Sequence, residues 1–153
     1  MKITICGSMA FHSGMEKMRG ILEKMGHKVK VPLLRIEVEE KGKGRKMSIR
    51  KAIEEAGGID NFPHNHPMWK EKSKAIDDHF EKVKWCDSIL VMNHPKHGID
   101  GYVGGNTLME MGLAKYLRKK IYILFPVSSK MSYKEEILGM KPVIIKGNVE
   151  KIV

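Results

Sequence analysis

The residue best placed to do chemistry is Glu110, a carboxylate on an otherwise apolar helical stripe. Spacings of three, four and seven residues put it in register with Leu113, Ala114 and Leu117. Burying an unpaired charge is costly, so a carboxylate at such a position invites a functional explanation. In a dry pocket it could attack an anomeric carbon or stabilise an oxocarbenium-like transition state.

The same glutamate has a simpler explanation. Thr107 and Glu110 fit the T-x-x-E capping box, in which the glutamate reaches back to the threonine amide. The spacing alone does not decide between a cap and a reactive group. Both interpretations predict that a helix begins at about residues 106–108.

The loop before this helix is suited to contact a ligand. Gly104 and Gly105 lack a Cβ atom, so the backbone can turn sharply and come close to a bound molecule. A helix that starts here, at about Asn106, directs its free N–H groups and positive dipole end at the loop. An anion or a sugar oxygen would fit there.

Strand-like and helix-like segments alternate along the chain, which predicts an α/β fold. The strands are expected at 2–6, 27–32, 87–93, 121–125 and 142–145, and the longer helices at 13–25, 68–86 and 106–120. A capping-box pattern at Ser13 and Glu16 would start the first helix. We expect a doubly wound, flavodoxin/Rossmann-like parallel sheet of order 2-1-3-4-5, with helices on both faces.

In such a sheet, ligands bind where the strand order reverses, beyond the carboxyl ends of strands one and three. The loops there are 7–12 and 93–106. This places Gly7 and Ser8 around the same pocket as Glu110. Residues 1–153 are predicted to form a single domain, with an irregular lid or dimer arm at about 33–66.

The composition indicates which partners and which cellular location to expect. The 28 Lys and Arg against 18 Asp and Glu give a net charge of +10, which favours anionic partners. The cations are spread from Lys2 to Lys151, so a nucleic-acid partner is not expected. Cys6 and Cys86 are predicted to be buried thiols in a reducing compartment. With no signal peptide or membrane span in the sequence, a cytoplasmic location is expected.

Several motifs are absent from the sequence. There is no G-x-S-x-G elbow, Walker A motif or G-x-G-x-x-G fingerprint. His64 and His66 lie between prolines and lack further ligands, so a metal site is not expected there. No cofactor and no metal are predicted.

Three segments carry a resemblance to a known family. Cys6-Gly7-Ser8, the run 86–91 and the run 105–114 resemble the nucleoside 2-deoxyribosyltransferase superfamily, which includes 2′-deoxynucleoside 5′-phosphate N-hydrolases. The resemblance covers 2–32 and 76–145, and is closest to a branch with a Gly-Gly-Asn-Thr-x-x-Glu-Met-Gly pattern. It implies that Glu110 is the catalytic glutamate that attacks C1′, and that the protein pairs as a homodimer.

The resemblance also implies a set of substrate-binding residues. Gly7, Ser8 and Met9 match the loop that contacts sugar, base or 5′-phosphate, but the family's arginine is missing from Met9-Ala10-Phe11-His12. A helical aspartate of the family falls at about Asp78 or His79. With the residues of the second loop, the predicted binding set is Gly7, Ser8, Met9, Asp78, His79, Asn93, Gly104, Gly105 and Asn106.

Three functions are compatible with these observations. The leading hypothesis is an enzyme that cleaves or transfers the N-glycosidic bond of a (deoxy)nucleoside or its 5′-monophosphate. The alternatives are a nucleotide-binding module without turnover and, after it, a nucleic-acid-binding protein that uses the charge of +10.

Overall fold

The computed structural model describes residues 1–33, 37–39 and 46–153. Their contacts divide the chain into two compact units, one made of residues 1–32 and 80–153 and the other of residues 33–79. The expected insertion at 33–66 lies within the second unit, and its role as a lid or dimer arm stays a prediction.

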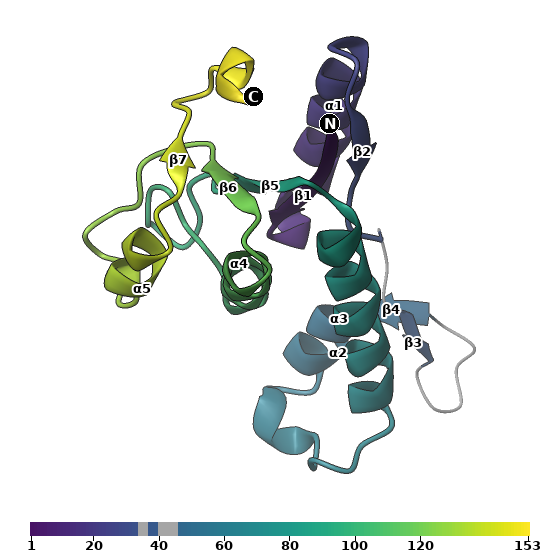
Figure 1. Ribbon diagram of the computed structural model, residues 1–153. Helices are drawn as coiled ribbons and strands as arrows, with labels where there is room; N and C mark the ends of the chain where they lie inside the picture. Colours follow the sequence, from purple (N-terminus) through teal and green to yellow (C-terminus); the bar gives the residue numbers. More distant parts are fainter. Residues whose placement is uncertain (34–36, 40–45) are drawn as a thin grey trace. The chain divides into compact units, whose positions relative to one another are not determined.

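The first unit is built around a five-stranded parallel sheet (Figure 1). Its order is β2-β1-β5-β6-β7, which is 2-1-3-4-5 when only the strands of this sheet are counted, as predicted. All four neighbouring pairs run parallel. The strands are β1 (Lys2–Gly7), β2 (Lys28–Lys30), β5 (Ser88–Met92), β6 (Lys120–Ile123) and β7 (Val143–Ile144).

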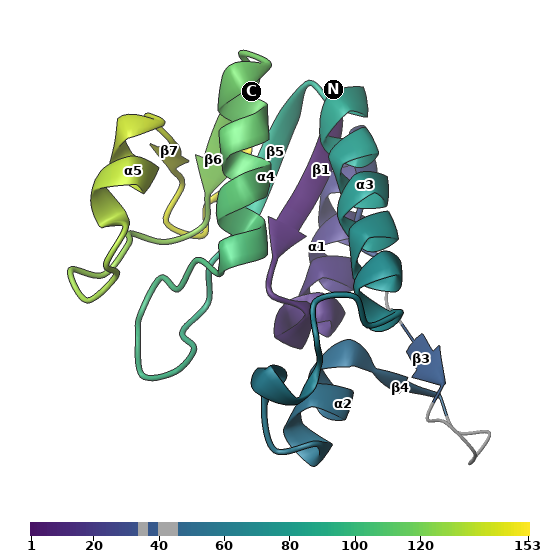
Figure 2. The same ribbon diagram turned by 90° about the horizontal axis from the view of Figure 1, so that it is seen from below.

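Helices cover both faces of this sheet, as the sequence predicted, and α1 and α4 lie on opposite faces (Figure 2). On one face, α1 buries Met15 and Leu22 against the strands. On the other face, α4 and α5 bury Met111 and Ile137, joined by the last turns of α3. The elements are α1 (His12–Lys24), α3 (Met68–Trp85), α4 (Gly105–Tyr116), α5 (Lys134–Gly139) and the 3-10 turns η1 (Met9–Phe11) and η3 (Val149–Lys151).

The central strand β5 is buried along its whole length. Ile89 and Val91 point into one core cluster, and Leu90 and Met92 point into the other. Successive side chains of a strand alternate between faces, so a strand covered on both sides must be apolar throughout. The run from Ile89 to Met92 meets that requirement.

The second unit contains a short antiparallel hairpin and two helices. The hairpin was not predicted, whereas the long helix expected at 68–86 is present as α3. The Ser48 hydroxyl caps α2 by accepting from the Lys51 amide at 3.2 Å, and Gly57 ends it with a φ of 82°. The elements of this unit are β3 (Glu37–Glu39), β4 (Lys46–Ser48), α2 (Ile49–Glu55), η2 (Ile59–Asn61) and the first part of α3.

The predicted capping box at the start of the first helix is wrong. The helix begins at His12, and its N-cap residue Phe11 makes no side-chain cap hydrogen bond. The chain enters α1 directly from η1, whose own N-cap is Ser8. Ser13 is therefore already inside the helix. Among the described residues, no helix has the length and apolar content needed to span a membrane.

Candidate active site

The carboxyl ends of β1 and β5 meet at Gly7 and Met92, which are register partners. A Cβ atom on Gly7 would lie 2.9 Å from the Met92 carbonyl oxygen. Because that neighbour is backbone and cannot move aside cheaply, only glycine fits at this point. Gly7 thus lets the chain leave β1 at the place where the strand order reverses, which is where ligands bind in such sheets.

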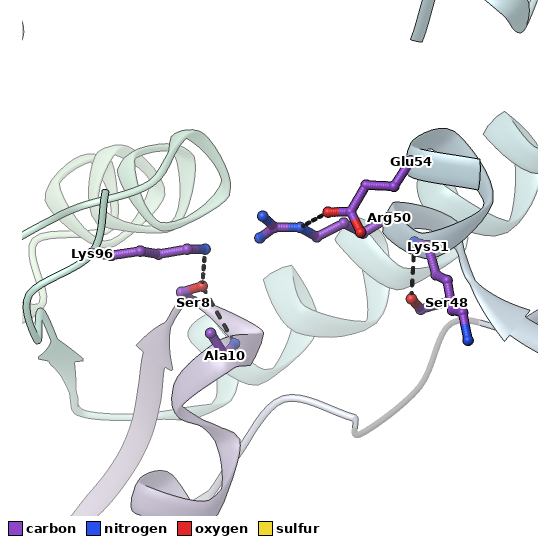
Figure 3. A network of polar contacts seen from close by, with 7 residues as sticks. All are labelled: Ser8, Ala10, Ser48, Arg50, Lys51, Glu54 and Lys96. Atoms are coloured by element: carbon purple, nitrogen blue, oxygen red, sulfur yellow. Dashed lines mark hydrogen bonds and ion pairs between the residues drawn. The ribbon is translucent and has the colours of Figure 1, made fainter. Parts of the chain in front are cut away.

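A hydrogen bond joins the two loops that the fold was expected to bring together (Figure 3). The Lys96 ammonium donates to the Ser8 hydroxyl at 2.7 Å. The same hydroxyl accepts a longer bond of 3.4 Å from the amide of Ala10, which it caps. The loop after β1 and the loop after β5 are therefore linked through a cation. Lys96 could not be predicted from the sequence as a site residue, because one lysine in a turn of a lysine-rich chain gives no distinguishing signal.

Glu110 lies in the second turn of α4, not in the first turn as predicted. The helix begins at Gly105 with Gly104 as its N-cap, and no side chain caps it. Thr107 is already the third helical residue and is 2% exposed, so it packs in the core. The capping-box explanation of Glu110 is thus wrong.

The Glu110 carboxylate is buried beside the end of β1. Glu110 is 8% exposed, and Cys6 is fully buried. The Cys6 Sγ and a Glu110 carboxylate oxygen lie within 4.8 Å of one another. Burial raises the pKa of the Cys6 thiol well above its usual range, and the neighbouring Glu110 charge raises it further. The thiol therefore stays protonated and uncharged beside Glu110.

Asn93 connects the ends of β5 and β6. Its side chain is fully buried. The amide group donates to the Phe125 carbonyl at 2.8 Å, and its oxygen accepts from the Phe125 amide at 2.8 Å. This pair of bonds uses both ends of the Asn93 amide, so its evident role is to hold the loop after β5 against the loop after β6.

A pocket of about 570 Å³ lies beyond the carboxyl ends of β5 and β6. Its walls come from the same two loops that Asn93 connects, including His94, Gly101, Phe125 and Pro126. The His94 ring packs edge-on against Phe125 with centroids 5.5 Å apart. None of the predicted site residues lines this pocket. Glu110 faces β1 instead, so the carboxylate and the pocket occupy neighbouring parts of the same sheet edge.

A known protein with a similar structure agrees with this topology. The 2-deoxyribosyltransferase of Bacillus psychrosaccharolyticus is similar at a TM-score of 0.52 and 15% sequence identity, over 86% of this chain and 77% of that one. The protein has the fold of a nucleoside 2-deoxyribosyltransferase. The CMP N-glycosidase BcmB of Clostridium botulinum is similar at a TM-score of 0.46 and 16% identity, over 94% of this chain and 83% of that one. No protein-family model and no curated protein sequence matches the chain.

Within the deoxyribosyltransferase fold, the other predicted site residues fall into two groups. Gly104, Gly105 and Asn106 form the start of α4, where Gly105 and Asn106 are exposed. Met9 is 43% exposed in the turn after β1. These residues lie in the first unit with Glu110, and their contact with a ligand stays a prediction.

Asp78 and His79 belong to the second unit, at consecutive positions of α3. His79 is buried and Asp78 is partly exposed. The same unit contains His66, whose Nδ1 accepts a hydrogen bond of 3.2 Å from the Met68 amide. That bond caps the start of α3 and uses one of the two nitrogens that His66 could offer to a metal.

Proposed function

We propose that the protein cleaves or transfers the N-glycosidic bond of a (deoxy)nucleoside or of its 5′-monophosphate, with Glu110 as the nucleophile. The observation that carries the proposal is the buried Glu110 carboxylate, which lies within 4.8 Å of the Cys6 Sγ at the end of β1 in a deoxyribosyltransferase fold. The alternative explanation of this glutamate, a helix cap, does not apply. A buried carboxylate without a capping role fits a reactive group.

The proposed reaction has two displacements at the anomeric carbon. A Glu110 oxygen attacks C1′ while the bond from C1′ to the base nitrogen breaks, and the base leaves with the electron pair and takes up a proton. The resulting glycosyl ester is then attacked at C1′ by water, which loses a proton, or by a nitrogen of a second base. Water makes the protein a hydrolase, and a base makes it a transferase. In both cases Glu110 is released as a carboxylate.

Cys6 supports this role as a neutral neighbour of the carboxylate. A protonated thiol whose Sγ lies within 4.8 Å of a Glu110 oxygen adds no competing negative charge beside it. The thiol is itself held protonated by burial and by Glu110, so it does not compete as a nucleophile. Cys6 is thus an uncharged neighbour, and Glu110 is the group that touches the substrate.

Ser8 and Lys96 are the proposed contacts for the polar end of the substrate. An ammonium group 2.7 Å from a hydroxyl offers a charge and a donor to a phosphate or a sugar oxygen. The exposed amides at the start of α4, around Gly105, add further donors. We extend the proposal to Gly7, Met9 and Asn106 as neighbours of the sugar, and to Asp78 and His79 as contributions of the second unit.

A screen for base release tests the proposal. Nucleosides and 5′-monophosphates are incubated with the wild type and with Glu110→Gln, and free base is measured by chromatography. Glu110→Gln should abolish release and retain the fold, while Glu136→Gln, an exposed glutamate of α5, should keep full activity. Equal release by wild type and Glu110→Gln would refute the role of Glu110. Thermal stabilisation by a nucleotide without any base release would assign the protein to the non-catalytic class.

The resemblance also implies a homodimer, which we include in the proposal. Partner residues would then complete the pocket, and the second unit could act as a lid or an arm. Light scattering coupled to gel filtration gives the mass in solution, and a monomer at all concentrations would contradict this part.

A further inference from the structure

A second pocket lies at the other edge of the sheet, away from the candidate active site. It has a volume of about 510 Å³ and is formed where α4 and α5 end and where β6 and β7 begin. Strands of a parallel sheet all begin at one edge and end at the other, so this pocket and Glu110 are on opposite edges. We call it the basic pocket, lined by Lys115, Tyr116, Arg118, Lys119, Lys120, Ile121, Met140, Lys141 and Val143.

Five of these nine residues are cations, and none is acidic. Lys119 and Lys120 are fixed by the chain itself, since their ammonium groups donate to the backbone carbonyls of Lys84 and Val153 at 2.8 and 2.9 Å. Three further cations are exposed and form no ion pair with any described residue: Lys115, Arg118 and Lys141. The pocket thus gathers positive charge that the protein itself does not neutralise.

Two of these cations occupy backbone positions that ordinarily take glycine. Arg118 and Lys141 each follow the C-cap of a helix, and each has a φ of 56°. Glycine is the usual residue at this left-handed position, and it is present after α1, at Gly26, and after α2, at Gly57. A side chain there is strained. At the two helix ends that form the basic pocket, the chain carries a long cation instead.

The remaining lining supplies an apolar floor and an aromatic rim. Ile121 is buried, while Met140 and Val143 are only partly covered. Tyr116 lines the pocket with 82% of its surface exposed. Cations beside an exposed aromatic ring are the combination with which proteins bind single strands, because phosphates pair with the cations and bases stack on the ring.

We propose that the basic pocket binds single-stranded nucleic acid, with phosphate groups at Lys115, Arg118 and Lys141 and a base stacked on Tyr116. Three free cations match the charge of successive phosphates better than that of one phosphate group. Lys141 is distant in sequence from Lys115 and Arg118, and the fold brings it to the same pocket. This binding is independent of the reaction proposed for Glu110, because the two sites lie at opposite edges of the sheet.

Fluorescence anisotropy with a labelled, short single-stranded oligonucleotide tests the proposal. The logarithm of the binding constant should fall with the logarithm of the salt concentration with a slope of about −2, since each phosphate contact to a single strand contributes about 0.7. Arg118→Gly and Lys141→Gly should each reduce that slope by about 0.7 and retain the fold, because glycine suits the backbone there. Tyr116→Ala should weaken binding by roughly tenfold without changing the slope.

Lys146→Gly is the matched control, because Lys146 is also an exposed cation with a positive φ, of 50°, but does not line the basic pocket. It should leave the salt slope and the affinity nearly unchanged. Glu110→Gln should bind the oligonucleotide as the wild type does, whether or not the wild type releases bases. Equal losses in Lys146→Gly and Arg118→Gly would overturn the proposal. So would a mononucleotide or a polyglutamate peptide that binds this pocket while the oligonucleotide does not.

Discussion

Replacing Asn93 by alanine tests whether this residue holds the fold or binds the substrate. Its amide makes two hydrogen bonds of 2.8 Å with the backbone of Phe125. Each contributes about 1 kcal/mol, and leaving the partly buried Phe125 groups without partners adds roughly 1–3 kcal/mol. We therefore expect Asn93→Ala to lower the free energy of unfolding by about 3–5 kcal/mol. For a chain of this size the corresponding fall in Tm is about 6–20 °C.

Thermal and urea unfolding, followed by circular dichroism, measure this loss. Asn148→Ala is the control, because Asn148 is exposed and accepts a single hydrogen bond of 3.0 Å from the Glu150 amide. It should cost no more than about 1 kcal/mol, as for an ordinary cap. If Asn93→Ala unfolds like the wild type and only raises KM, Asn93 is a substrate ligand and the reasoning from its hydrogen bonds is refuted.

Three further predictions follow from single contacts. The raised pKa of Cys6 means that the unfolded chain releases this proton at a lower pH than the folded one, so stability is full below about pH 9 and falls above it. Above that pH, the free energy of unfolding measured in urea should therefore fall by about 1.4 kcal/mol more per pH unit in the wild type than in Cys6→Ser. Equal slopes in the two proteins would contradict this prediction. If the proposed function holds, Lys96→Met should raise KM for a 5′-monophosphate about tenfold and leave that for the nucleoside unchanged, in steady-state assays. Gly101→Ala should destabilise by more than about 3 kcal/mol, because its Cβ would lie 2.0 Å from the Pro126 oxygen, whereas Gly98→Ala, with nothing within 4 Å, should cost only about 1 kcal/mol.

The sheet and its order could be predicted from the sequence because they rest on patterns that burial imposes. The run from Ile89 to Met92 has to be apolar on both sides, and the alternation of strands with helices leaves few topologies. The order then predicted that the loops after β1 and β5 would meet. The bond between Ser8 and Lys96 confirms that they do.

The parts that could not be predicted depend on contacts between distant residues or on where a helix begins. Because α4 begins two residues before Thr107, Thr107 is a core residue and not the expected cap, and Glu110 lies in the second turn. The pairing of Cys6 with Glu110 joins a strand to a helix more than a hundred positions away, and nothing local to either residue marks it. The hairpin of β3 and β4 has strands of three residues each, too short to give a periodic signal.

The complete burial of β5 has a consequence for following the protein in solution. A strand covered on both faces exposes its backbone amides only when the whole sheet opens. Hydrogen exchange at the amides of Ile89, Leu90 and Val91 should therefore report the global free energy of unfolding, residue by residue. The same amides would then serve as an internal standard against which the exchange of the loops around Ser8 and Lys96, with and without a ligand, can be compared.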